Sequence, residues 1–263
     1  MVEINKEKCI GCGKCAEDCI KLNIVLNGSK AQVKGECLQC GHCVAVCPAG
    51  AVSIPEYDME DVEEYRPDLS FPGTEEILRS IKFRRSIRRY RKQPVARQDL
   101  ELLVEAGRYT ATAKNSQGSG FLIVQEELEH LKALVWDFID QAQKEEHHQR
   151  NKQLLSYFVF NRRRKKNPED DYLFRNAPVV LFITAENSVD AGMAAQNIEN
   201  IAVSMGLGAL YNGYLAGIAD ANAELKQWLG AEDKTIRICM LLGYPDIRYL
   251  RTVPRKKPFV VWK

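Results

Sequence analysis

The sequence lacks a long uninterrupted apolar run. The longest is APVVLFITA, at 177–185, which is far shorter than the ~20 residues that a membrane-spanning helix needs. The opening MVEINKEKC is polar and lacks the apolar core of a secretory signal. We therefore expect a soluble, cytoplasmic protein with no membrane partner.

Charge of one sign is also scarce. The chain has 37 Lys and Arg against 35 Asp and Glu, a formal net charge of +2 over 263 residues. A net charge this small produces only a weak overall electrostatic field, which does not favour nucleic acid as a partner. A Rossmann dinucleotide site is not supported either, because GLGALYNG at 206–213 lacks the G-x-G-x-x-G spacing. The length allows one large domain or two smaller ones.

Cysteine, by contrast, is concentrated near the start of the chain. Eight of the nine cysteines fall in two stretches, CIGCGKCAEDC at 9–19 and CLQCGHCVAVCP at 37–48. Disulfides are disfavoured, because the three-residue steps give poor pairing geometry and thiols in a reducing compartment stay free. Zinc usually takes two well-separated C-x-x-C pairs. An iron–sulfur cubane instead offers several iron corners to three thiolates of one short loop.

The last cysteine of each stretch then completes the other cluster, as in the C-x-x-C-x-x-C-x-x-x-C-P pattern. This predicts two [4Fe–4S] clusters, one on Cys9, Cys12, Cys15 and Cys47 and one on Cys37, Cys40, Cys43 and Cys19. The stretch resembles the bacterial two-cluster ferredoxin family over residues 1–55, although Ile20 stands where the family usually has proline. Between the two halves, NIVLNGSKAQV predicts a hairpin with Asn27-Gly28 in its turn.

The remaining chain alternates helical and strand patterns. Residues 56–75 are acidic and contain proline, which indicates a linker, and Thr74 is expected to cap a helix. Apolar runs at 121–124, 177–184 and 235–244 predict strands, and amphipathic segments between them predict helices. The fold class is α+β: a small ferredoxin-like domain, then a second α+β domain at 76–263.

The segment FRRSIRRY, Phe83–Tyr90, suggests an anion site. If it is extended, Arg84, Ser86 and Arg88 point the same way and form a row of donors. Arginine forks match phosphate oxygens, and a flavin mononucleotide phosphate carries nearly two charges. The alternative, equally open from the residues alone, is a solvated basic helix end.

The order FRRSIRRY, TATAKNSQGSGFLIV, MGLGALYNGYL, LLGYPDIRYLRTVPRK resembles the FMN-dependent nitroreductase family over roughly residues 76–263. That resemblance implies a mainly antiparallel central sheet flanked by helices, and a homodimer with FMN at its interface. The FMN-binding residues that it implies are Arg84, Arg85, Ser86, Arg88, Ala111, Thr112, Asn115, Gln117, Asn161, Tyr211, Asn212, Gly213, Arg251 and Arg255.

The resemblance also implies roles for these residues. The FRRSIRRY row would hold phosphate and ribityl oxygens, and the loop at 111–117 would reach the flavin from the other subunit. The N–H groups of Asn212–Gly213 would lie near the flavin N5. Arg251 and Arg255 would complete the phosphate clamp, and the apolar tail PFVVWK would wrap the partner.

Residues 145–172 depart from compact family members and suggest an extra helix with a charged loop. Asn161 in this segment matches a family asparagine that contacts the flavin ring. The basic run at 162–166 is typical of a solvated face, with a docking patch for an acidic partner as the minority interpretation. Cys239, in IRICMLL, is expected in the core.

Iron–sulfur clusters move single electrons, and a flavin can deliver two electrons together. A chain that carries both can therefore convert single-electron transfer into two-electron transfer. We therefore predict an iron–sulfur flavoprotein oxidoreductase that reduces a small organic acceptor of nitroaromatic, quinone or enone type, in an anaerobic host. A ferredoxin or another redox protein is the expected donor, and no catalytic side chain is assigned. The alternatives are an electron-transfer or redox-sensing module without enzymatic activity, and a zinc-binding interaction module.

Overall fold

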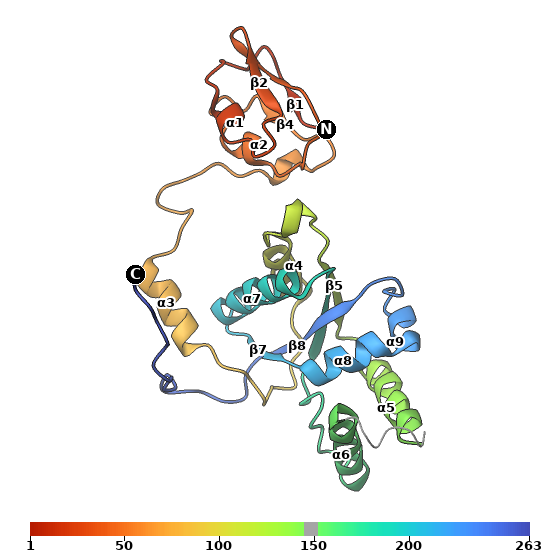
Figure 1. The fold of residues 1–263 in the computed structure, drawn as a ribbon. Coiled ribbons are helices and arrows are strands. Elements are labelled where there is room, and N and C mark those ends of the chain that lie inside the picture. The colour runs from red at the N-terminus through yellow and green to blue at the C-terminus, as the bar shows by residue number, and fades with distance from the viewer. Residues whose placement is uncertain (145–151) are drawn as a thin grey trace. The chain divides into compact units, whose positions relative to one another are not determined.

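The computed structural model describes residues 1–144 and 152–263, and the chain forms two compact units (Figure 1). Unit 1 comprises Met1–Pro72 with Ala113–Ser116, and unit 2 comprises Gly73–Thr112 with Gln117–Lys263. The division between them along the chain falls inside the predicted linker at 56–75. In the described ranges, no helix is both long and apolar enough to cross a membrane.

Unit 1 consists of short elements around an apolar centre. β1 (Glu3–Ile4) pairs antiparallel with β4 (Val52–Ser53), and β2 (Ile24–Asn27) pairs antiparallel with β3 (Lys30–Val33). Two single-turn helices, α1 (Lys14–Glu17) and α2 (His42–Ala45), and the 3₁₀ turn η1 (Met59–Asp61) complete the unit. Its core combines aliphatic residues such as Ile24 and Ile54 with buried cysteines.

The β2–β3 hairpin confirms the predicted strands but moves the turn by one residue. Asn27 pairs with Lys30, so the two connecting residues are Gly28 and Ser29 instead of Asn27 and Gly28. Gly28 has a φ of 62°, which glycine adopts without a steric penalty.

Unit 2 is built on a four-stranded antiparallel sheet. The order is β5 (Gly120–Val124), β6 (Val179–Thr184), β8 (Ile236–Gly243) and β7 (Gly208–Tyr211). All six residues of β6 are buried, because both of its faces are covered. The predicted antiparallel α+β architecture is confirmed.

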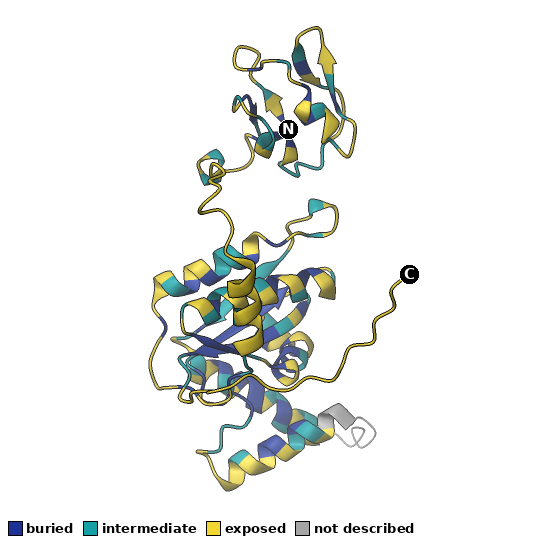
Figure 2. Cartoon of the chain, turned by 90° about the vertical axis from the view of Figure 1, so that its left-hand side faces the viewer, coloured by how far each residue is buried: buried dark blue, intermediate teal, exposed yellow. Residues whose placement is uncertain are grey.

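Helices cover the two faces of this sheet (Figure 1). One face packs Leu181 and Met240 against α4 (Arg97–Arg108) and α7 (Ser188–Ser204). The other packs Phe182 and the predicted core cysteine Cys239 against a second set of helices. That set is α5 (Leu128–Lys144), α6 (Lys152–Lys166), α8 (Gly213–Ala221) and α9 (Ala223–Trp228). Figure 2 shows the sheet as the most continuously buried part of the unit.

The helix α3 (Thr74–Phe83) opens unit 2, and none of its residues is buried. Thr74 was expected as its cap, but Gly73 occupies the N-cap position and its N–H donates to Glu76 Oε2 at 3.2 Å. Thr74 is instead the first helical residue. The chain ends in an exposed segment from Arg251 to Lys263 without helix or strand.

Candidate functional site

Four thiols of unit 1 line one cavity. Cys9, Cys12, Cys15 and Cys47 form its walls together with small and aliphatic residues. Burial raises the pKa of the Cys15 thiol, and the thiols of Cys47, Cys12 and Cys9 raise it further. The structure thus brings together the last cysteine of one stretch and the first three of the other.

The second set of thiols centres on α2. Burial raises the pKa of Cys43 to about 11, with further contributions from Cys37 and Cys40. Cys19 follows the end of α1 and packs in the same apolar cluster as Cys37 and Cys43. In residues 1–144 and 152–263, no three His, Cys, Asp or Glu side chains form a group that could hold a metal ion.

Backbone N–H groups already point at several of these sulfurs. Ala31 N–H lies 3.4 Å from Cys9 Sγ, Gln39 N–H 3.2 Å from Cys37 Sγ, and Ala51 N–H 3.3 Å from Cys47 Sγ. Hydrogen bonds to cluster sulfurs are one of the means by which a protein sets a cluster's potential.

Glycines at positive φ allow these loops to turn close to the thiols. Gly13 (φ 81°) and Gly41 (φ 77°) are the N-caps of α1 and α2. At Gly11 (φ 69°), a Cβ would lie 2.1 Å from the carbonyl oxygen of Ser29, so a larger residue cannot fit without a backbone shift.

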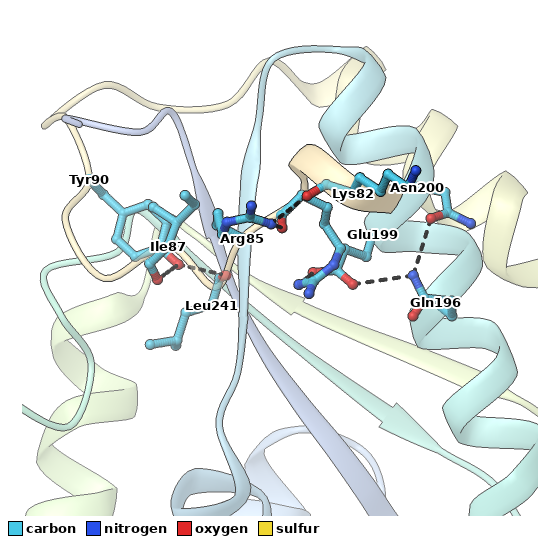
Figure 3. A network of polar contacts seen from close by, with 9 residues as sticks. Lys82, Arg85, Ile87, Tyr90, Gln196, Glu199, Asn200 and Leu241 are labelled. Carbon is cyan, nitrogen blue, oxygen red and sulfur yellow. Dashed lines mark hydrogen bonds and ion pairs between the residues drawn. The ribbon is translucent and has the colours of Figure 1, made fainter. Parts of the chain in front are cut away.

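In unit 2, FRRSIRRY runs beside β7. Ser86 forms a parallel bridge with Ala209, and Ile87 N–H donates to Ala209 O at 3.0 Å. The buried Tyr90 hydroxyl donates to Ile87 O at 2.9 Å and lies 3.0 Å from Leu241 O (Figure 3). These contacts anchor the motif to the sheet.

The two arginines that open the motif have different surroundings. Arg84 Nη1 donates to Glu199 Oε1 at 2.9 Å, and the Glu199 side chain is only 2% exposed. Gln196 Nε2 donates to the other oxygen of this carboxylate at 3.2 Å (Figure 3). Arg85 Nη1 donates to Lys82 O at 2.7 Å, whereas its Nε and Nη2 are buried without a hydrogen-bond partner in the described part of the chain.

Arg88 lines a cavity of about 450 Å³. Tyr211, Asn212 and Gly213, at the junction of β7 and α8, line the same cavity. Arg84 and Ser86 are not among the described residues that line it, so the row of three donors expected from an extended segment is not gathered in this cavity.

The Asn212 side chain holds the local structure. Its Oδ1 accepts from Leu215 N–H at 3.1 Å and caps α8, and its Nδ2 donates to Leu173 O at 2.7 Å. Its backbone N–H, expected near a flavin, donates to Cys239 O at 2.8 Å. Gly213 N–H lies in the first turn of α8, where backbone donors have no acceptor within the helix and the helix dipole is positive.

The loop at 111–117 holds several residues at positive φ. Lys114, Asn115 and Gln117 have φ values of 55°, 55° and 48°. Within unit 1, Asn115 Nδ2 donates to the carbonyl oxygens of Leu38 at 3.2 Å and Gln39 at 3.0 Å. Gln117 N–H donates to Thr112 Oγ1 at 2.9 Å, and Ala111 is exposed beside it.

The other predicted FMN residues do not line the cavity either. Asn161 is 0% exposed, and its Nδ2 donates to Asp140 Oδ1 at 2.6 Å and to Gln143 Oε1 at 3.2 Å. Arg251 and Arg255 lie in the exposed C-terminal segment.

The basic run at 162–166 is largely engaged inside unit 2. Arg163 pairs with Asp170 at 2.7 Å, Lys165 pairs with Asp140, and the Arg164 guanidinium lies 4.7 Å from the Trp136 ring centroid. These contacts favour the interpretation of a structural, partly solvated face over that of a docking patch.

Sequence reasoning missed part of the cavity wall. Arg175 and the rings of Phe160, Tyr172 and Tyr214 line it beside Arg88. No spacing in the sequence connects these residues, because the fold brings α6, the segment before β6 and the start of α8 together.

Comparisons with known proteins agree with this two-part organisation. The profile of the nitroreductase family matches residues 81–244, and that of a 4Fe-4S dicluster domain matches residues 1–64. The comparison with curated proteins finds no match.

Several solved structures share the fold of unit 2. A nitroreductase with bound FMN from Bacteroides fragilis is 21% identical, with a TM-score of 0.58, covering 71% of this chain and 99% of that chain. One with bound FMN from Desulfitobacterium hafniense is 22% identical, with a TM-score of 0.56, covering 71% and 98%. An FMN-dependent nitroreductase from Clostridium difficile is 19% identical, with a TM-score of 0.52, covering 71% and 98%.

Proposed function

Because the chain belongs to the nitroreductase family and carries an N-terminal 4Fe-4S dicluster domain, we propose that it is an iron–sulfur flavoprotein oxidoreductase. Electrons pass from two [4Fe–4S] clusters to FMN and on to a small organic acceptor of nitroaromatic, quinone or enone type. A ferredoxin or another redox protein supplies the electrons.

The observation that carries this proposal is the fusion of two sites in one chain. Four thiols line one cavity in unit 1, and in unit 2 Arg88 shares a cavity with the N-terminal end of α8. Thiolates suit iron–sulfur clusters. Arginine and a helix N-terminus suit an anionic cofactor.

The donors of unit 2 fit FMN. Arg85 has two buried nitrogens, Nε and Nη2, without partners in the described part of the chain, as expected where a phosphate would be the acceptor. In the cavity beside α8, Arg88 would contribute a guanidinium to FMN, and Gly213 N–H would donate to the flavin ring from the positive end of α8. FMN, when bound, supplies the conversion between single-electron and paired-electron transfer.

In the described residues the thiols of unit 1 do not gather around a single metal ion, but a cubane offers several iron corners and can take thiolates that lie farther apart. Cys9, Cys12, Cys15 and Cys47 would hold one cubane, and Cys37, Cys40, Cys43 and Cys19 the other. Backbone N–H groups at Cys9, Cys37 and Cys47 would stabilise the negative charge on the ligand sulfurs.

A homodimer would cover the apolar surface that one chain leaves open. α3 exposes Ile77, Leu78, Ile81 and Phe83 along its length. In the tail, Phe259 is 94% and Trp262 is 91% exposed. Apolar surface of this kind is typical of an interface. In such a dimer the loop at 111–117 and the arginines of the tail would be available to the cofactor of the other subunit.

Anaerobic turnover tests the proposal. The full chain is purified, reconstituted and reduced with a limiting amount of dithionite, then mixed with nitrobenzene, menadione or cyclohexenone while the flavin absorbance is followed. Reoxidation of the flavin after each further addition of dithionite, with formation of reduced acceptor, is the expected result. Protein that binds no FMN would refute the proposal, and flavin that is reoxidised only by redox proteins would favour a non-enzymatic relay.

A further inference from the structure

The cavity beside α8 contains two guanidinium groups and several aromatic rings. Arg88 and Arg175 line it together with Phe160, Tyr172 and Tyr214. Burial strongly raises the pKa of the nearby Tyr90 hydroxyl, while Arg175 and Arg88 both act to lower it. Both guanidinium groups are therefore close enough to Tyr90 to affect the pKa of its hydroxyl. The proposed function uses Arg88 for the cofactor and leaves Arg175 unassigned.

A braced turn presents Arg175 to this cavity. Arg175 and Asn176 have φ values of 58° and 51°, which are uncommon for residues other than glycine. The Asp171 carboxylate accepts from Phe174 N–H at 3.0 Å and from Asn176 N–H at 3.2 Å. The adjoining Leu173 carbonyl accepts the Asn212 side chain at 2.7 Å, so the turn is fixed to the start of α8.

Within the described residues, no carboxylate neutralises the charge of Arg175. Among the residues that the structure describes, no carboxylate pairs with Arg175, and its guanidinium lies 3.8 Å from the Tyr172 ring centroid. Arg163 lies 4.5 Å from the same ring but pairs with Asp170 at 2.7 Å, and it does not line the cavity. Among the described residues, Arg175 therefore faces the cavity with free donors, whereas Arg163 is paired with Asp170 and lies outside the cavity wall.

We propose that Arg175 selects acceptors in which a planar aromatic ring carries a carboxylate. The guanidinium fork matches the two oxygens of a carboxylate, and stacking on Tyr172 holds the fork in place. The rings of Phe160 and Tyr214 offer apolar contact to the ring of the acceptor. The proposal rests on the proposed function, since it places the acceptor beside FMN.

Equilibrium binding tests this role without turnover. Titration calorimetry on the oxidised, FMN-loaded protein compares 4-nitrobenzoate with nitrobenzene, which has the same ring and nitro group but no charge. In Arg175→Gln the Kd for 4-nitrobenzoate should rise by ~10-fold to ~100-fold, the usual effect of losing a charged hydrogen bond. The Kd for nitrobenzene should stay within about twofold.

Two further variants control the experiment. Arg163→Gln removes the other cation from Tyr172 and should leave both Kd values unchanged. Arg175→Lys keeps the charge but loses the fork, so its Kd for 4-nitrobenzoate should fall between those of the native protein and Arg175→Gln.

Other results would overturn the proposal. These are an unchanged Kd for 4-nitrobenzoate in Arg175→Gln, an equal loss for both ligands, or a loss of FMN from that variant, which would assign Arg175 to the cofactor. Failure of the proposed function has a different signature, because the native protein itself would then bind no FMN.

Discussion

The ion pair between Arg84 and Glu199 joins the start of unit 2 to α7, and its contribution to stability can be measured. The substitution Glu199→Gln removes the negative charge but keeps the shape and one oxygen acceptor. Loss of one partner from a fully buried pair costs ~3–5 kcal/mol. The Arg84 side chain is 24% exposed, so water can hydrate it in part, and we expect a smaller loss of about 2 kcal/mol.

Thermal unfolding of the flavin-free protein is the assay, because bound cofactor would add its own stabilisation. For a domain of this size, about 2 kcal/mol corresponds to a Tm decrease of about 4–8 °C. A double-mutant cycle with Arg84→Met separates the pair from other effects, and its coupling energy should reach at least ~1 kcal/mol. Additivity of the two substitutions within ~0.5 kcal/mol would refute the account of this pair.

Three further predictions follow from the same structure. Gly11→Ala places a Cβ against a backbone carbonyl oxygen and should lower the Tm of unit 1, whereas Gly28→Ala, with open space around it, should lower it less. Burial raises the pKa of Asp140, but hydrogen bonds from Lys165 and Asn161 outweigh it and hold the pKa below its usual value. The stability from Asp140 is therefore present above about pH 4 and lost as pH falls through the lowered pKa, so Asp140→Asn should flatten the acid side of a Tm–pH curve. Deletion of residues 256–263 should convert the proposed homodimer to a monomer in light scattering, and a tail-deleted chain that remains dimeric would contradict the role given to the tail.

Three of the four strands of the sheet, β5, β6 and β8, could be predicted from the sequence because apolar runs are local signals, whereas β7 (Gly208–Tyr211) was not predicted. Each apolar run became a strand, and the amphipathic segment at 97–108 became α4 with Leu100, Leu103 and Gly107 buried. The cysteine spacing also predicted that Cys47 would lie with Cys9, Cys12 and Cys15, and these four thiols line one cavity. The assignment of both sets of thiols to clusters stays a prediction. The capping position at Gly73 differed by one residue, as helix ends often do.

The proposed flavin site was harder to predict, because its residues are joined only by tertiary packing. Periodicity could not show that Arg84 would find a buried carboxylate on α7, 115 residues away along the chain. It also could not show that the Asn212 N–H would be used by Cys239. Arg175 carries no motif at all and enters the cavity because Asp171 shapes its turn.

The measurement that tests the central claim most directly is the cofactor content of the anaerobically purified and reconstituted full chain. Two cubanes and one flavin predict about eight irons, about eight sulfides and one FMN per chain, with the cluster and flavin absorbance bleached together by dithionite. Zinc in place of iron, or iron and sulfide without any bound flavin, would contradict the account.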